Sequence, residues 1–128
     1  MIKFLSKYKF KEENMLRKNC KLDFEYNDGE LLIFIKGELD HYSAVWVRGE
    51  IDKKIVETSP RSAVLVLSGI DFMDSSGIGL VMGRYARMQN IGGTLTVRDP
   101  GERVERILRL AGIERIVNIE KREKDDEK

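Results

Sequence analysis

Two adjacent serines, Ser75 and Ser76, stand in a polar, glycine-containing stretch that could carry chemistry. The stretch is DFMDSSGIGL (residues 71–80), and it comes shortly after an apolar run. A serine at a turn between a strand and a helix can act as a nucleophile, cap the helix, bind a phosphate or be phosphorylated. The surrounding residues distinguish among these four roles.

The nucleophile hypothesis lacks the usual local pattern. In the nucleophile elbow of hydrolases, glycines lie two residues before and two residues after the serine. Neither Ser75 nor Ser76 is flanked in this way. His41 is the single histidine of the chain and therefore its only possible imidazole base. Because His41 and Ser75 both follow predicted strands, a Ser-His-Asp arrangement with Asp40 or Asp74 stays open as an alternative.

Three glycines follow the serines: Gly77, Gly79 and Gly83. Their G-x-G-x-x-x-G pattern is one residue longer than the dinucleotide-binding fingerprint, and no lysine follows the last glycine as a P-loop requires. The segment is therefore not expected to bind a nucleotide. Each glycine costs a helix about 1 kcal/mol relative to alanine. We expect this helix either to approach the sheet closely or to keep its surface low so that a partner can lie on it.

The serines also stand where a helix is expected to begin. Asp74 or Ser75 can cap that helix by accepting hydrogen bonds from its first N–H groups. A phosphoryl group is tolerated at this positive end of a helix. Phosphorylation adds about −1.5 to −2 charges at pH 7. Beside Asp74, and near Asp71 and Asp40, that charge would make the surface strongly anionic and would expel a partner without refolding.

Hydrophobic periodicity predicts an α/β fold around these residues. Strands are expected at residues 22–26, 31–35, 63–67 and 94–97, helices at 42–57, 76–89 and 99–112, and a last edge strand or short helix at 113–119. A turn at 27–30 joins the first two strands as a hairpin. This order predicts a mixed sheet that is mostly parallel, with an antiparallel leading edge and helices packed on it.

The connections and caps can be predicted as well. Residues 37–40 and 68–75 are polar and contain glycine, so we expect loops there. Ser43 is expected to cap the first helix and Asp99 the last. The unbroken apolar run at 63–67 is typical of a central strand that is covered on both faces.

The length and composition indicate one folded domain with two charged ends. We predict a domain at residues 21–120, an N-terminal extension at 1–20 that is mobile or loosely docked, and a charged tail at 121–128. The segment 1–21 has a net charge of +5, whereas 22–112 has −3. A mildly acidic body argues against direct binding of nucleic acid.

Other classes of function are disfavoured by what the chain contains. One cysteine and one histidine provide neither a disulfide nor a zinc site, and no metal or cofactor is expected. No apolar run has the length that a membrane span needs. We therefore predict a cytoplasmic protein that does not bind a membrane.

Two segments carry a resemblance to a known family. GELDHYSA (residues 37–44) and FMDSSGIGLVMGRYARMQNIGG (72–93) closely resemble the signature segments of the STAS-domain anti-sigma factor antagonists, in particular the sporulation members. The resemblance extends over about residues 22–119 and leaves the N-terminal extension unmatched. It implies the STAS fold, a four- to five-stranded sheet with helices packed on it.

The resemblance also implies a switch rather than an enzyme. The unmodified antagonist would bind a kinase-type anti-sigma factor and thereby release a sigma factor. The kinase would phosphorylate Ser75, and a metal-dependent serine phosphatase would reverse the modification. By the same resemblance, the partner surface comprises Asp40, His41, Asp74, Ser76, Gly77, Gly79, Gly83 and Arg84, the last four at the start and on the exposed side of the second helix. The alternative is a STAS scaffold or regulator in a stress-response or other partner-switching complex.

Overall fold

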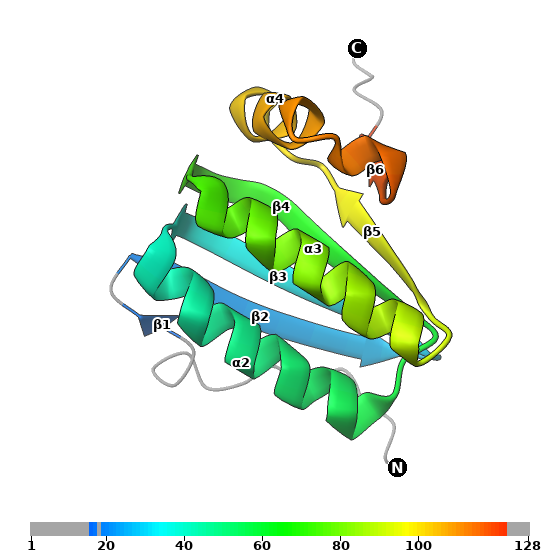
Figure 1. Cartoon of the computed structure of the whole chain (residues 1–128). Coiled ribbons are helices and arrows are strands. Elements are labelled where there is room, and N and C mark those ends of the chain that lie inside the picture. The colour runs from blue at the N-terminus through cyan, green and yellow to red at the C-terminus, as the bar shows by residue number, and fades with distance from the viewer. Residues whose placement is uncertain (1–15, 18, 123–128) are drawn as a thin grey trace.

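A computed structural model describes residues 16–17 and 19–122, in which strands and helices alternate in the predicted order (Figure 1). The strands are β1 (Leu16–Arg17), β2 (Cys20–Asn27), β3 (Glu30–Leu39), β4 (Ser62–Met73), β5 (Thr94–Arg98) and β6 (Asn118–Glu120). The helices are α2 (His41–Thr58), α3 (Ser75–Asn90), α4 (Glu102–Leu110) and the 3-10 helix η2 (Ile113–Arg115). The segment 113–119 thus contains both a short helix and an edge strand.

The strands form one sheet in the order β1-β2-β3-β4-β5-β6. β1, β2 and β3 pair antiparallel, and β3 to β6 pair parallel. The prediction of an α/β fold with a mixed sheet and an antiparallel leading edge is confirmed. The hairpin between β2 and β3 turns at Asp28 and Gly29, which both have positive φ (55° and 83°) as a type I′ turn requires.

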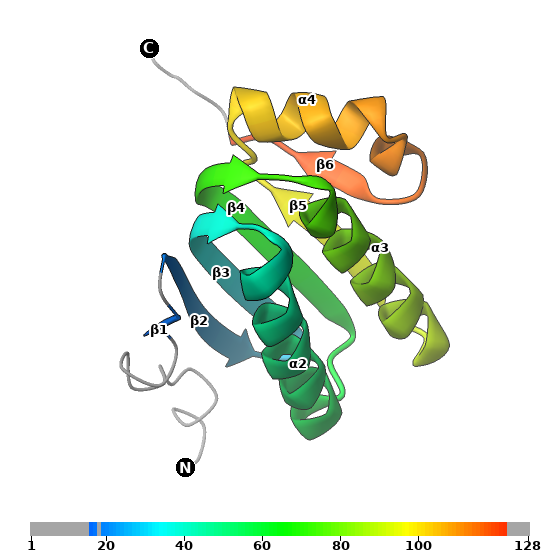
Figure 2. The same cartoon turned by 60° about the vertical axis from the view of Figure 1, so that its left-hand side comes forward.

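The helices lie on a single face of the sheet. Each parallel connection advances by one strand in the same direction, and right-handed crossovers then place every helix on the same side. Figure 2 shows α2 and α3 side by side over this face. α4 contributes Val104 and Leu108 to the same hydrophobic core, which also contains Leu22, Ile33 and Leu65 from the strands.

Two predicted loops are wrong, because β3 and β4 are longer than their apolar runs. β3 continues through residues 37–39 and β4 through 68–73, with register shifts between Phe34 and Lys36 and between Gly37 and Glu38. Pairing between the two strands overrides the loop propensity of these polar residues. The connections to the following helices shrink to one residue each, Asp40 and Asp74.

Two predicted helix caps are also wrong. Asp40, not Ser43, is the N-cap of α2, and Gly101, not Asp99, precedes α4. Asp99 instead accepts a hydrogen bond from the backbone N–H of Arg122 at 2.6 Å. Its carboxylate therefore ties the end of the described chain to the start of α4.

The N-terminal extension predicted at residues 1–20 falls mostly outside the described residues. Its described part pairs with the sheet, because Leu16 and Arg17 face Lys21 and Cys20 of β2. Cys20 itself is buried in the core, and burial raises the pKa of its thiol to about 11. Of the predicted tail only residues 121–122 are described. Within the described part of the chain, no helix has the length and apolarity to cross a membrane.

Gly37 provides a test of this fold near the start of α2. Its φ is +97°, and a Cβ atom there would collide with the carbonyl oxygen of Asn19, which accepts a hydrogen bond from the N–H of Glu38 at 2.9 Å. We expect Gly37→Ala to lower the free energy of unfolding by about 2 kcal/mol or more, as measured by urea denaturation. Gly49→Ala is the control, since Gly49 lies in α2 with open space around it. This substitution should raise the free energy of unfolding by about 0.5–1 kcal/mol. Equal effects of the two substitutions would contradict this description.

Candidate functional site

The candidate site lies where the first two parallel strands end. Leu39 of β3 and Met73 of β4 are register partners, and each is followed directly by an aspartate and then by a helix. The N–H of Asp74 reaches the carbonyl oxygen of Leu39 at 3.4 Å, so the two chain reversals are joined. The N-termini of α2 and α3 consequently lie beside each other at one end of the sheet (Figures 1 and 2).

Asp40 and Ser43 form a reciprocal capping box at the start of α2. The N–H of Ser43 donates to Oδ1 of Asp40 at 3.0 Å, and the N–H of Asp40 donates to Oγ of Ser43 at 2.9 Å. The hydroxyl of Ser43 also donates to the carbonyl oxygen of Glu38 at 2.8 Å. The hydrogen bond from the backbone of Ser43 is the main reason that the pKa of Asp40 is lowered, so this carboxylate stays charged at neutral pH.

Asp74 caps α3, and the side chain of Ser75 after it stays exposed. Oδ1 of Asp74 accepts a hydrogen bond from the N–H of Ser76 at 2.8 Å, and its carbonyl oxygen accepts one from Gly77 at 2.9 Å. Ser75 is the first helical residue and is exposed, and its hydroxyl makes no hydrogen bond to any described residue. Of the two caps predicted from the sequence, Asp74 is therefore the one that the structure uses.

A shallow groove separates the starts of the two helices. It has a volume of about 250 Å³ and is lined by His41, Ala44, Val45, Arg48, Ser76, Gly79 and Leu80. Three of the predicted partner-binding residues thus come together in one hollow, with Asp40 and Asp74 at the base of its two helices. His41 and Arg48 thus line the groove near two helix N-termini, whose dipoles favour negative charge and whose first N–H groups engage the carboxylates of Asp40 and Asp74.

Exposed apolar side chains also stand on α2, on α3 and at the end of β4, and the sequence analysis missed them. Tyr42 is 82% exposed, and Val45, Phe72 and Met82 are exposed as well. In the sequence, Val45 lies off the helical stripe of α2 that forms the core, and it falls four residues after His41. That spacing places both on one side of the helix, and it was the available signal for a second apolar surface.

The glycines of α3 play two different roles. Gly77 is buried, and a Cβ atom there would meet Sδ of Met73 at 2.7 Å, so only this glycine allows a close approach between helix and strand. A Cβ atom at Gly79 or Gly83 would have nothing within 4 Å. These two glycines lie four residues apart on one side of the helix and keep its outer surface low.

Gly77 lies at the start of α3, as expected, but Arg84 does not lie on the exposed side of the helix. Arg84 is only 6% exposed and lies between α3 and α2, where its Nε is 3.0 Å from Oδ1 of Asp52. Burial lowers the pKa of the guanidinium, and the charge of Asp52 opposes this shift. Arg87 approaches the same carboxylate oxygen at 3.6 Å. Arg84 therefore holds the two helices together beneath the surface and is not free to contact a partner.

The geometry does not favour the nucleophile alternative. In the described part of the chain no hydrogen bond joins His41 to Ser75 or Ser76, and the ring of His41 instead lies edge-on to Tyr42, with centroids 5.4 Å apart. Among the described residues, no group of three or more His, Cys, Asp or Glu side chains is placed to hold a metal ion.

The sequence model of the STAS domain family matches residues 21–125, so the chain belongs to this family. The match confirms the resemblance that the two signature segments carry. Within the family, the chain is similar to the anti-sigma F factor antagonist of Paenibacillus polymyxa, with 36% identity over 79% of this chain and 86% of the relative. It is also similar to the anti-sigma-B factor antagonist of Bacillus subtilis, with 30% identity over 79% of this chain and 91% of the relative.

Solved structures show the same fold. The anti-sigma factor antagonist SpoIIAA in its unphosphorylated form has a TM-score of 0.70 and 24% identity, and the match covers 82% of this chain and 90% of that one. The Bacillus cell fate determinant SpoIIAA in its phosphorylated form has a TM-score of 0.65 and 23% identity, over 82% and 94% of the two chains.

The pairing of Arg84 with Asp52 can be tested by removing one charge. Asp52→Asn keeps the size of the side chain but leaves the buried guanidinium without its counter-charge. We expect the free energy of unfolding to fall by about 2 kcal/mol, measured by urea denaturation. Glu50→Gln is the matched control two residues away, because the Glu50–Lys53 pair is long (3.9 Å) and exposed at Lys53. Its loss should change stability by less than about 0.5 kcal/mol; a comparable loss in both variants would refute the structural role of Arg84.

Proposed function

We propose that the protein is an anti-sigma factor antagonist whose unphosphorylated form binds a kinase-type anti-sigma factor and so releases a sigma factor. One observation carries this proposal. Ser75 is the exposed first residue of α3, its hydroxyl makes no hydrogen bond to a described residue, and its neighbour Ser76 lines a groove that a partner could cover. The names of the two sequence relatives, both anti-sigma factor antagonists, support it.

The surface has the features of a protein interface. Tyr42 and Val45 on α2 and Met82 on α3 provide exposed apolar area, and aromatic residues and methionine are enriched at interfaces. Gly79 adds a flat patch on which a partner's backbone can approach closely. In this proposal His41, Ser76 and Gly79 contact the partner, while Asp40 and Asp74 fix the two helix starts.

Phosphorylation of Ser75 would switch this surface off by charge. The phosphate would stand at the positive end of α3, so the helix tolerates it and the fold need not change. It would also stand beside the carboxylate of Asp74, and a partner would have to bury both charges together. The phosphorylated form of SpoIIAA shows that a protein of this fold can carry a phosphate.

The same exposure would allow the switch to be reset. A serine at the first position of a helix is accessible without unfolding, so a metal-dependent serine phosphatase could remove the phosphate. The chain itself acts as a binding protein and substrate in this scheme, not as an enzyme. Because the proposed partner controls transcription, we propose that the protein acts in the cytoplasm.

The sequence relatives favour two different pathways. One antagonises an anti-sigma F factor and the other an anti-sigma-B factor, and both cover about the same share of this chain. The second candidate is therefore a regulator in a stress-response or other partner-switching complex with the same mechanism. Affinity measurements against the anti-sigma factors encoded near this gene would separate the two pathways.

The modified residue can be identified with the cognate kinase. On incubation with the anti-sigma factor and ATP, we expect the wild-type chain to take up about one phosphate, and Ser75→Ala to take up none, as measured by intact-protein mass spectrometry. Ser76→Ala is the control, because its backbone N–H still donates to Asp74 and the helix cap survives. Phosphorylation of the Ser75→Ala chain would refute the site.

The charge mechanism can be tested without the kinase reaction. Ser75→Asp and Ser75→Asn add side chains of nearly equal size, but only the first adds a charge. We expect the aspartate variant to bind the anti-sigma factor at least about tenfold more weakly than the asparagine variant, measured by isothermal titration calorimetry. Equal affinities would show that size rather than charge disrupts the interface.

A further inference from the structure

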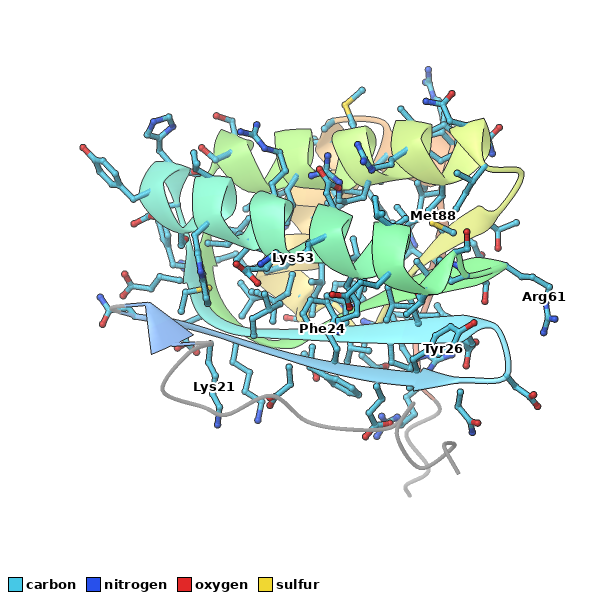
Figure 3. All side chains as sticks on the ribbon, turned by 90° about the horizontal axis from the view of Figure 1, so that it is seen from below. Lys21, Phe24, Tyr26, Lys53, Arg61 and Met88 are labelled. Carbon is cyan, nitrogen blue, oxygen red and sulfur yellow. The ribbon has the colours of Figure 1, made fainter. Side chains whose placement is uncertain are left out.

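The face of the sheet opposite the helices carries an apolar strip that the described elements leave bare. Figure 3 shows α2 and α3 on one side of the sheet, with Phe24 of β2 toward them and Lys21 of the same strand on the other side. The register places Leu32 beside Val64 and Phe34 beside Val66, and all four alternate with residues of the helix-side core. The strip consists of Leu32, Phe34, Val64 and Val66.

The two valines of this strip are nevertheless buried. Val64 is 3% exposed and Val66 is 7% exposed, and neither belongs to the core cluster beneath the helices. Neighbours in one layer of side chains can cover the flanks of a valine, but they leave its outer methyl groups open to water. One carboxylate oxygen of Asp23, the register partner of Phe34, is also buried and has no hydrogen-bond partner. A further layer therefore covers this face.

A segment of the same chain has the length and the starting point to form that layer. Fifteen residues precede β1, and β1 pairs with the edge strand β2 at Lys21 and Cys20. Fifteen extended residues span up to about 50 Å, whereas crossing from β2 to β5 requires only about 15 Å at a strand spacing of about 4.8 Å. The chain therefore enters the sheet at its edge with ample length to return across the open face.

The composition of this segment matches the surface. Besides Met1 and Met15, its apolar residues are Ile2, Phe4, Leu5, Tyr8 and Phe10, and its basic residues, Lys3, Lys7, Lys9 and Lys11, outnumber its acidic ones, Glu12 and Glu13. The hairpin end of the open face contains a hollow of about 430 Å³ in which Glu25, Asp28 and Glu30 outnumber one cation, Arg61. That arginine is occupied, since its Nη2 donates to the carbonyl oxygen of Asp28 at 2.6 Å. The carboxylates at this end of the strip therefore remain available to pair with the lysines of the segment.

We propose that residues 1–15 dock on the open face of the sheet, with their apolar side chains over Leu32, Phe34, Val64 and Val66 and their lysines toward the acidic hollow. The N-terminal segment then forms a second hydrophobic layer on the face away from Ser75. This intramolecular surface is independent of the proposed function, because it shares no residue with the candidate site.

A double-mutant cycle in the full-length chain tests this docking. In one background the segment is wild type; in the other Ile2, Phe4, Leu5, Tyr8 and Phe10 are all serine. Val64→Thr replaces a methyl group with a hydroxyl of similar shape. If the segment covers Val64, this substitution raises the equilibrium constant for unfolding about tenfold in the first background, because the hydroxyl is buried without a partner. In the serine background water reaches the hydroxyl, and we expect less than about a threefold change.

Val97→Thr is the matched control for the cycle. Val97 lies on β5, is fully buried and belongs to the core beneath the helices. Val97→Thr should raise the equilibrium constant for unfolding by the same factor in both backgrounds. If Val64→Thr also raised this constant by the same factor in both backgrounds, the docking proposal would be overturned. An unfolding midpoint that rises with protein concentration would also overturn it, because a second copy of the chain would then be the cover.

A crosslinking measurement tests the same contact without weakening the fold. Phe4 is replaced by p-benzoylphenylalanine, and the irradiated chain is digested and mapped by mass spectrometry. We expect crosslinks within one chain to peptides of β3 and β4. Crosslinks found only between chains, or only to α2 and α3, would overturn the proposal.

Discussion

The register between the ends of β3 and β4 is the constraint on which the site depends. Leu39 and Met73 are partners, and each is followed by one aspartate that caps a helix. With no loop between strand and cap, the position of each helix start is determined by the sheet rather than by a flexible connection. The hydrogen bond from Asp74 to Leu39 joins the two reversals directly. Any slip in this pairing would separate His41 from Ser76 and open the groove that they share.

This rigidity suits a switch that works by charge. In the proposed switch, a phosphate at Ser75 would meet a helix whose first N–H groups already engage Asp74, so the added charge would change the surface and not the fold. Beneath the surface, Arg84 and Asp52 hold α2 against α3, and Gly77 lets α3 lie close to Met73. Above it, Gly79 and Gly83 have open space. In α3, Gly77 thus allows close packing, whereas Gly79 and Gly83 keep the outer surface accessible.

The order of elements was within reach of sequence reasoning, whereas the ends of the strands were not. For α3 the sequence narrowed the cap to Asp74 or Ser75, because a capping residue and a following helix are both local features. Residues 37–39 and 68–73 have loop-like composition, and only pairing with each other makes them strands. The family resemblance placed Arg84 on the exposed side of α3, where a basic residue on an amphipathic helix normally lies. Its burial requires Asp52 on another helix, a contact that no local pattern reveals.

The central strand shows how a sequence can report on both faces of a sheet. Residues 63–67 are apolar without alternation, a pattern that predicts cover on both sides, and all five are buried. The helices account for Ala63, Leu65 and Leu67 only. A sheet whose crossovers all fall on one side needs another source of cover for Val64 and Val66. The family match begins at residue 21, so the residues suited to supply that cover lie outside the shared domain. In the docking proposal, a segment outside the family match covers this face of the sheet and shares no residue with the candidate site.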